Sequence, residues 1–241
     1  MRLDKAVTAA GISRKDAKRL IAAGRVTVDD RPARDPGLQL SSASRVALDG
    51  ETLVLRLHTH VMLNKPAGYV SATQDAHGLP VITELLPEAL SRLPLGPVGR
   101  LDRDVTGLML LTTDGQLAHR LISPRHGHVK RYEAVCEGKL NENCVLRFAE
   151  GMELGDFTAK PAVLTVTEEL DGATRCLVEI SEGKFHQVKR MFEKIGHPII
   201  RLKRVAIAGV FLDEALEEGQ CRLLTNDEAA RLYAAAGLEM E

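Results

Sequence analysis

The sequence predicts an α+β fold in two parts: a small N-terminal module, and a larger domain built on a mixed, largely antiparallel sheet. Two patterns lead to this prediction. Residues 1–59 combine a basic helix with a short hairpin, whereas residues 60–241 hold short apolar strands and amphipathic helices without regular alternation. The chain has 241 residues, of which 44% are hydrophobic, so it is long enough for one large domain with a small appendage.

The N-terminal module opens on an amphipathic helix that we expect over Arg14–Ala23. Ser13 is placed to cap this helix, and Asp16, three residues further on, is placed as its capping-box partner. Gly24 is the expected stop, because glycine adopts the left-handed conformation that commonly ends helices.

A short hairpin is expected directly after this helix. Residues 25–28 alternate as a strand does, and Asp29 and Asp30 supply the turn. Basic side chains occur on both elements: Arg14, Lys15, Lys18, Arg19 and Arg25. They are expected to contact RNA phosphates, although a basic amphipathic helix is also typical of an ordinary solvated surface.

The larger domain is expected to alternate irregularly between strands and helices. The strands expected are Val61–Asn64, Gly107–Thr112, Lys130–Glu137, Ala162–Glu168, Thr174–Ile180 and Ile199–Ala208. The helices expected are Val81–Leu86, Gly115–Ile122, Glu142–Glu150, His186–Ile195 and Asn226–Ala236.

Composition excludes several classes of protein. No window approaches the roughly 20 apolar residues that cross a bilayer, and the N-terminus lacks the apolar stretch of a signal peptide, so we expect a cytoplasmic protein without a membrane partner. The four cysteines lack C-x-x-C spacing. His126 and His128 have no third ligand at a suitable spacing, so no metal site is expected.

Charge is distributed unevenly although the formal net charge is only -1. Lysine and arginine outnumber aspartate and glutamate by 11 to 7 in residues 1–59, by 6 to 3 in residues 98–132 and by 7 to 1 in residues 183–204. Acidic residues predominate in residues 133–182 and 205–241. Three basic blocks form one surface for a polyanion if the fold brings them together, and they are scattered solvated faces if it does not.

A polar loop between Gly99 and Gly107 is the first candidate for chemistry. It leads into a continuous apolar stretch, so its charged residues stand at the mouth of a buried strand. Asp102 has arginines nearby in sequence, which also fits a structural salt bridge at a strand edge. Asp104 follows at i+2, and on an extended segment the two carboxylates point the same way, as in a glycoside hydrolase.

Two further windows carry basic and aromatic residues. A strand ends near Gly183, and a helix with donors at its start is expected from His186. Tyr132 enters a strand directly after a basic loop that contains Arg125, where it either stacks on a nucleobase or fills a core edge.

Four motifs in order resemble those of pseudouridine synthases: Asn64-Lys65-Pro66-Ala67-Gly68, Gly99-Arg100-Leu101-Asp102 with Thr106-Gly107-Leu108, Lys130-Arg131-Tyr132, and Gly183-Lys184-Phe185-His186-Gln187-Val188-Lys189-Arg190-Met191. The N-terminal module resembles, over roughly residues 1–48, the alpha-L RNA-binding motif known from a small-subunit ribosomal protein, most strongly from Gly11 through Val28. Together they are similar to the RsuA branch, which modifies small-subunit ribosomal RNA. Arg131 departs from the family pattern, and its role is left open.

The resemblance implies a role for each motif residue. Asp102 would be the catalytic carboxylate, Lys189 the cation that pairs with it, and Tyr132 the ring that packs against the target base. Arg100 would fill the gap left by the extruded nucleotide, as suits a planar guanidinium. Ile180 would line the base pocket, Lys65 and His186 would support the site or contact RNA, and Arg125 would be a further substrate-binding residue. Neither cofactor nor metal is implied.

The implied activity is isomerisation of a uridine in 16S ribosomal RNA, of the uridine-516 type. The implied substrate is this RNA, free or in a partly assembled subunit, and the protein is expected to be a monomer. The alternatives are a large-subunit pseudouridine synthase of the same family, a non-catalytic RNA-binding assembly factor, and a carbohydrate hydrolase that needs Asp104.

Overall fold

The computed structural model describes residues 2–10, 12–41, 44–53 and 58–240. The chain divides into two compact units, Met1–Thr59 and His60–Met240. Gly11, part of the alpha-L resemblance, lies outside the described residues.

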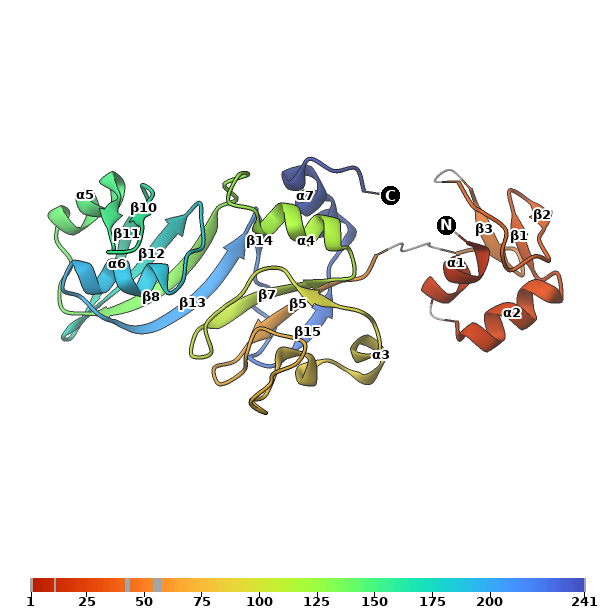
Figure 1. The fold of residues 1–241 in the computed structure, drawn as a ribbon, viewed down its shortest axis with the longest axis horizontal. Coiled ribbons are helices and arrows are strands. Elements are labelled where there is room, and N and C mark those ends of the chain that lie inside the picture. The colour runs from red at the N-terminus through yellow and green to blue at the C-terminus, as the bar shows by residue number, and fades with distance from the viewer. Residues whose placement is uncertain (1, 11, 42–43, 54–57, 241) are drawn as a thin grey trace. The chain divides into compact units, whose positions relative to one another are not determined.

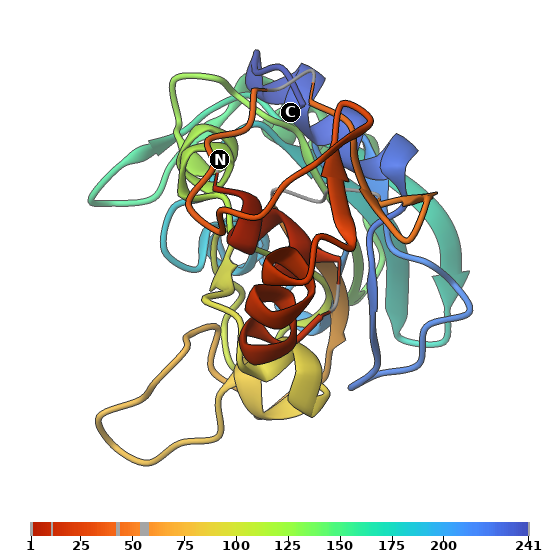
Figure 2. The ribbon, with the colours of Figure 1, turned by 90° about the vertical axis from the view of Figure 1, so that its right-hand side faces the viewer.

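The N-terminal unit packs two helices against a four-stranded sheet of order β2-β1-β3-β4. Its elements are α1 (Leu3–Ala9), α2 (Arg14–Ala22), β1 (Val26–Val28), β2 (Arg31–Pro32), β3 (Val46–Leu48) and β4 (Glu51–Thr52). The two helices lie side by side (Figure 2) and bury Leu3, Val7, Ala17 and Ile21 between them and the sheet. The sequence did not predict α1, which has no side-chain N-cap.

The predicted helix and hairpin of this unit are confirmed. Ser13 caps α2 by accepting a hydrogen bond from the Asp16 backbone N–H at 3.2 Å. Asp29 and Asp30 have φ angles of 49° and 64°, which form the tight two-residue turn between β1 and β2.

The larger unit is built on a nine-stranded sheet (Figure 1), with strand order β11-β12-β8-β13-β7-β5-β15 and with β14 and β6 paired to β13 and β7. The main strands are β5 (His60–Lys65), β7 (Thr106–Thr112), β8 (Lys130–Glu137), β11 (Val163–Leu170), β12 (Ala173–Ile180) and β13 (Ile199–Ile207). The shorter ones are β6 (Gly96–Pro97), β14 (Val210–Phe211) and β15 (Cys221–Leu223), while β9 (Met152–Glu153) and β10 (Thr158–Ala159) form a separate pair. Only β13 and β7 pair in parallel, so the prediction of a mixed, largely antiparallel sheet is confirmed for the described residues.

Helices cover both faces of this sheet. They are α3 (Glu88–Ser91), α4 (Gly115–Ile122), α5 (Glu142–Glu150), α6 (Gln187–Lys194) and α7 (Asn226–Ala236). The helix expected at Val81–Leu86 is instead a short 3₁₀ turn, Ile82–Leu85. It ends because Leu86 precedes a proline, which forces Leu86 into the extended region. Among the described residues, no helix is both long and apolar enough to cross a membrane.

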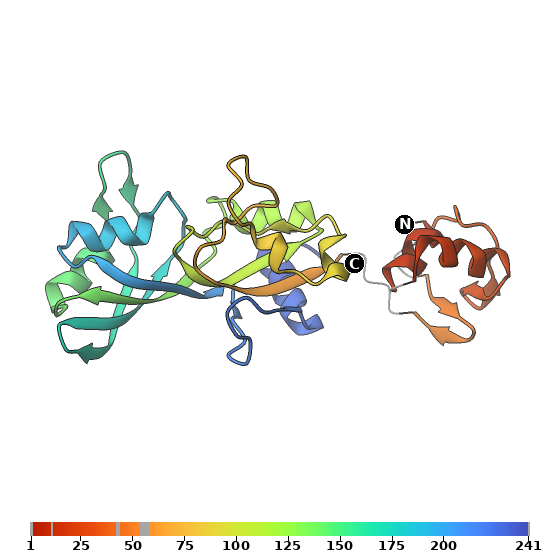
Figure 3. The same cartoon turned by 90° about the horizontal axis from the view of Figure 1, so that it is seen from below.

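Alternating residues of β5 and β7 divide the core into two layers. Leu63 and Met109 face the cluster that α5 and α6 cover, whereas Met62 and Leu108 face the cluster under α4 and α7. Figure 3 shows α6 and α7 on opposite sides of the sheet. All seven residues of β7 are buried, as a strand covered on both faces requires.

The parallel contact between β7 and β13 depends on Gly107. Its φ is 100°, and a Cβ atom there would lie 2.3 Å from the carbonyl oxygen of Arg204. Only glycine fits at this position, at the end of the polar loop. The parallel pairing that joins the two halves of the sheet therefore requires Gly107.

Candidate active site

The polar loop between β6 and β7 folds into a turn. The Val105 N–H donates to the Asp102 carbonyl at 3.2 Å, so the expectation that Asp102 and Asp104 lie on an extended segment is wrong. A buried ammonium explains the bend, because the Lys65 Nζ donates to the carbonyls of residues 66, 102, 103 and 105 at 2.8–3.2 Å. Four convergent acceptors curl the chain around one cation.

Lys65 is fully buried beneath this turn and does not reach solvent. Burial lowers its pKa from 10.5 to about 8, although Asp104 and Asp102 nearby act in the opposite direction. Because it is buried, Lys65 cannot contact RNA directly, and what it can do from this position is support the loop.

Lys189, on α6, meets both carboxylates of the loop. Its Nζ lies 2.6 and 2.8 Å from the two carboxylate oxygens of Asp104, and 3.4 Å from Oδ2 of Asp102. The hydrogen bond from Lys189 holds the pKa of Asp104 below its usual range. The structure thus brings Asp102 and Lys189 together, but with the shorter contact to Asp104.

His186 approaches Asp102 from the same side of the site. Its Nε2 lies 3.6 Å from Oδ1 of Asp102, whose side chain is 29% exposed. Asp104 is far more open, with a side chain that is 73% exposed. Asp102 is therefore the sheltered carboxylate of the pair.

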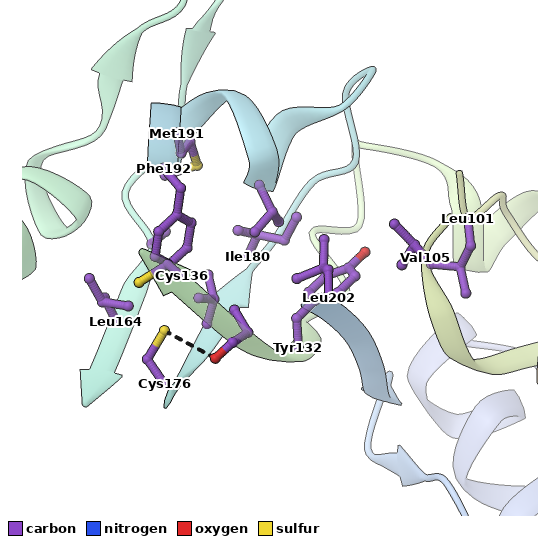
Figure 4. Packing of buried hydrophobic residues seen from close by; sticks show 14 of the residues in the cluster. Leu101, Val105, Tyr132, Cys136, Leu164, Cys176, Ile180, Met191, Phe192 and Leu202 are labelled. Atoms are coloured by element: carbon purple, nitrogen blue, oxygen red, sulfur yellow. Dashed lines mark hydrogen bonds between the residues drawn. The ribbon is translucent and has the colours of Figure 1, made fainter. Parts of the chain in front are cut away.

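Asp102 opens into a cavity of about 720 Å³, a volume within the range of about 300–1,000 Å³ typical of small-molecule sites. Polar lining residues include Arg100, Asp102, Lys130, Tyr132, Lys184, His186, Lys189 and Arg204. Figure 4 shows Tyr132, Ile180 and Leu202 on the strand side of the site, with Leu101 and Val105 across from them. These side chains give the cavity an apolar wall beside its charged groups.

Two buried cationic residues line the cavity but were not predicted from the sequence to be site residues: Lys130 and Arg204. The Lys130 Nζ donates to the His128 carbonyl at 3.3 Å, and burial lowers the pKa of Lys130 to about 8. The Arg204 Nε donates to the Leu108 carbonyl at 2.9 Å, while its buried Nη2 has no hydrogen-bond partner among the described residues. The signal for Lys130 was its i, i+2 spacing from Tyr132, which places both on one face of β8.

The other expected site residues differ in how close they lie to the cavity. Ile180 is buried in the cavity wall, and Arg100 is exposed at the cavity. Arg125 is exposed on the loop between α4 and β8, outside the described cavity lining. Arg131 donates to Glu179 at 2.6 Å and lies 5.4 Å over the Phe211 ring, so it stabilises the sheet.

The five basic residues that were expected to contact RNA phosphates are all exposed: Arg14, Lys15, Lys18, Arg19 and Arg25. Arg19 pairs with Asp16 and Arg25 with Asp49, both at the surface, where such pairs contribute little to stability. In the part of the chain that is described, no three His, Cys, Asp or Glu side chains are grouped to hold a metal ion.

The arrangement combines one sheltered carboxylate, a shared ammonium and an aromatic ring around a cavity with room for a planar base. A carboxylate so placed can attack an electrophilic carbon or accept a proton from it. The cavity walls can retain a detached fragment while it turns.

Comparison of the chain with known proteins shows its family. Residues 59–194 match the family model of RNA pseudouridylate synthases, and residues 1–46 match that of the S4 domain. The chain belongs to the RNA pseudouridine synthase family, whose members are isomerases. The predicted family resemblance and enzyme class are thereby confirmed.

Its relatives include enzymes that match it nearly end to end. It is 41% identical over 235 residues to ribosomal small subunit pseudouridine synthase A of Escherichia coli K12, covering 95% of this chain and 99% of the relative. It is 38% identical over 231 residues to the uncharacterized RNA pseudouridine synthase YtzG of Bacillus subtilis, covering 95% and 96%. A solved pseudouridylate synthase superposes with a TM-score of 0.68 at 35% identity, covering 96% and 99%, and agrees with the predicted fold class.

Proposed function

We propose that this protein isomerises a uridine of small-subunit ribosomal RNA to pseudouridine, with Asp102 as its catalytic carboxylate. The observation that carries the proposal is the meeting of Asp102, Lys189 and Tyr132 at one cavity, from three separate motifs. The choice of RNA is supported by the near full-length similarity to the Escherichia coli enzyme, whose name states the small subunit.

The reaction sets demands that this cavity meets. The bond between nitrogen 1 of the base and ribose carbon 1 breaks, the base turns, and a new bond forms from ribose carbon 1 to base carbon 5. Carbon 5 then loses its proton, and nitrogen 1 gains one. Because the atoms are only rearranged, no cofactor enters the proposal. Asp102 either attacks the substrate or accepts a proton from the sugar, and Lys189 and His186 orient it for either route.

The target base has to leave the RNA stack to reach Asp102. In the proposal its plane packs against the buried ring of Tyr132, with Ile180 and Leu202 completing the apolar wall. Arg100, exposed at the cavity, fills the space that the extruded nucleotide leaves in the RNA. Its charge and flat shape suit a place between stacked bases.

The N-terminal unit binds ribosomal RNA in this proposal, through phosphate contacts from its exposed basic side chains. The finer assignments form part of the same proposal. The target is a uridine of the 516 type, met in free RNA or in a partly assembled subunit, and the protein acts as a monomer in the cytoplasm.

Mapping pseudouridine in ribosomal RNA from cells with and without this protein tests the function. We expect one small-subunit uridine to lose its modification in the deletion strain and to regain it with the wild-type gene. A lost large-subunit site would instead assign the protein to the other branch of the family. Identical maps would favour the non-catalytic assembly factor.

A further inference from the structure

Phe185 stands out as an exposed aromatic ring at the cavity. It is 71% exposed, the largest value among the exposed large hydrophobic residues of the described chain. It lies in the loop between β12 and α6, next to His186, and both residues line the cavity. The two rings are stacked, with centroids 3.8 Å apart and planes 18° apart.

The loop holds this pair in place. Gln187 is buried, donates from Nε2 to Glu182 at 2.8 Å, and accepts from the Lys184 backbone N–H at 3.0 Å. His186 has a φ of 50°, a left-handed conformation that is unfavourable for a residue with a side chain. A strained residue fixed by a buried neighbour is typical of a preorganised functional loop.

The charges around the ring indicate what covers it. Phe185 lies in the block of residues 183–204, which carries seven lysine and arginine residues and one acidic residue. Lys184 and Lys189 line the same cavity, and Arg100 lines it from the other loop. Single-stranded RNA fits this combination, because it offers phosphates to the cations and a flat π-face to the exposed ring.

We propose that the Phe185–His186 stack is a platform for the nucleobase that neighbours the extruded uridine in the RNA. The inference rests on the proposed function, which places the uridine itself against Tyr132. His186 already contacts Asp102, so a base on the outer face of Phe185 is separated from the catalytic carboxylate by the stacked pair. A base in this position belongs to a nucleotide that flanks the target uridine, in an RNA strand from which that uridine has been flipped out.

A fluorescence titration reads this contact directly, because the chain contains no tryptophan. Phe185→Trp introduces a single indole at the platform, and protein-free small-subunit ribosomal RNA is the probe. We expect the RNA to quench the indole as a base stacks on it. Phe211→Trp is the matched control, since Phe211 is 52% exposed on β14 and lies outside the described cavity lining.

Steady-state kinetics of Phe185 variants distinguish a stacking contact of the ring from a simple apolar contact. Phe185→Leu keeps an apolar side chain but loses the π-face, so we expect KM for the RNA to rise about 5- to 150-fold, the range that follows from stacking energies. The loss should fall on KM rather than on kcat, Phe185→Tyr should restore wild-type KM, and Phe211→Leu should leave KM unchanged.

Equal quenching in the two tryptophan variants, or an unchanged KM in Phe185→Leu, would overturn the platform. Failure of the proposed function looks different, because wild-type protein would then form no pseudouridine in small-subunit RNA. The fluorescence titration needs no catalysis, and it still reports whether a base stacks on residue 185 in that case.

Discussion

Lys189 is the cation around which both carboxylates of the loop gather. It contacts the exposed Asp104 more closely than the sheltered Asp102. Ion pairs with an exposed partner contribute little, so the contact with Asp104 is easily exchanged. We infer that Asp104 holds the lysine until the substrate covers the site, and that Asp102 is the partner that matters in the reaction.

Substitution of Asp104 and of Lys189 should therefore have unequal effects. Asp104→Ala should retain activity, because Lys189 remains free to approach Asp102. Lys189→Met should lower kcat by about 10²- to 10³-fold, comparable to the loss of one preorganised donor. Rates of pseudouridine formation at saturating RNA measure both. An inactive Asp104→Ala variant would revive the two-carboxylate hydrolase reading of this loop.

The sequence could predict that residues belong to the site where a motif carried them, and could not where burial placed them there. Asp102, Tyr132 and Lys189 stood in recognisable motifs, and the structure places them at one cavity. Lys130 and Arg204 were not identified as cavity residues, since charged side chains are usually exposed. Their burial follows from the pairing of β8 with β13, a long-range register that no local pattern reveals.

Elements with a cap or a clear period were predicted almost to the residue. The helix Gly115–Ile122 begins where Asp114 accepts two backbone N–H groups, and Asn226–Ala236 begins at a capping box on Thr225. The short strands β14 and β15 were missed because two or three residues alone are too few to show alternation. The equally short β1 was predicted because the Asp29-Asp30 turn follows it.

The close contact of β7 with β13 at Gly107 can be tested by substitution. Gly107→Ala would place a Cβ atom 2.3 Å from the Arg204 carbonyl oxygen, so we expect a loss of more than about 3 kcal/mol in the free energy of unfolding. Gly209→Ala is the control, because φ there is 78° but no atom lies within 4 Å of the added Cβ. Urea unfolding compares them, and equal losses would mean that backbone strain alone accounts for the effect.

The start of α7 gives a prediction about pH. Hydrogen bonds from Arg222 lower the pKa of Glu228 from 4.5 to about 2. A lowered carboxyl pKa stabilises the fold above pH 4.5, and this stabilisation is lost as the pH falls towards 2. We expect Glu228→Gln to cost about 1.5–3 kcal/mol at pH 7. The difference from wild type, followed by urea unfolding, should shrink below pH 4.5, and a gap that stays constant to pH 2.5 would contradict the assignment.

At the scale of the whole molecule, each unit has a core of its own. Leu3, Ile21 and Val26 belong to the N-terminal cluster, separate from the two clusters of the larger unit. The sequence predicted two parts because the helical module and the irregular succession of strands differ in pattern. It did not predict how the nine strands are ordered, since that order depends on contacts between residues far apart in the chain.

Independent cores allow the N-terminal unit to be tested for RNA capture. Removal of residues 1–59 should weaken RNA binding more than it disturbs the larger unit. In the full chain, Arg14→Ala and Lys18→Ala should each reduce the slope of log affinity against log salt by about 0.7–0.9, one phosphate contact apiece. Arg92→Ala, an exposed arginine on the larger unit, serves as the control. Slopes that do not differ from wild type would exclude phosphate contacts at these residues.

The central claim is that Asp102 performs the chemistry, and tritium release from small-subunit ribosomal RNA labelled at uridine carbon 5 tests it most directly. Wild-type protein should release tritium from the target uridine, because carbon 5 loses its hydrogen when the new bond forms. Asp102→Asn, nearly equal in size, should bind the same RNA and release none. Full release by Asp102→Asn would contradict the account.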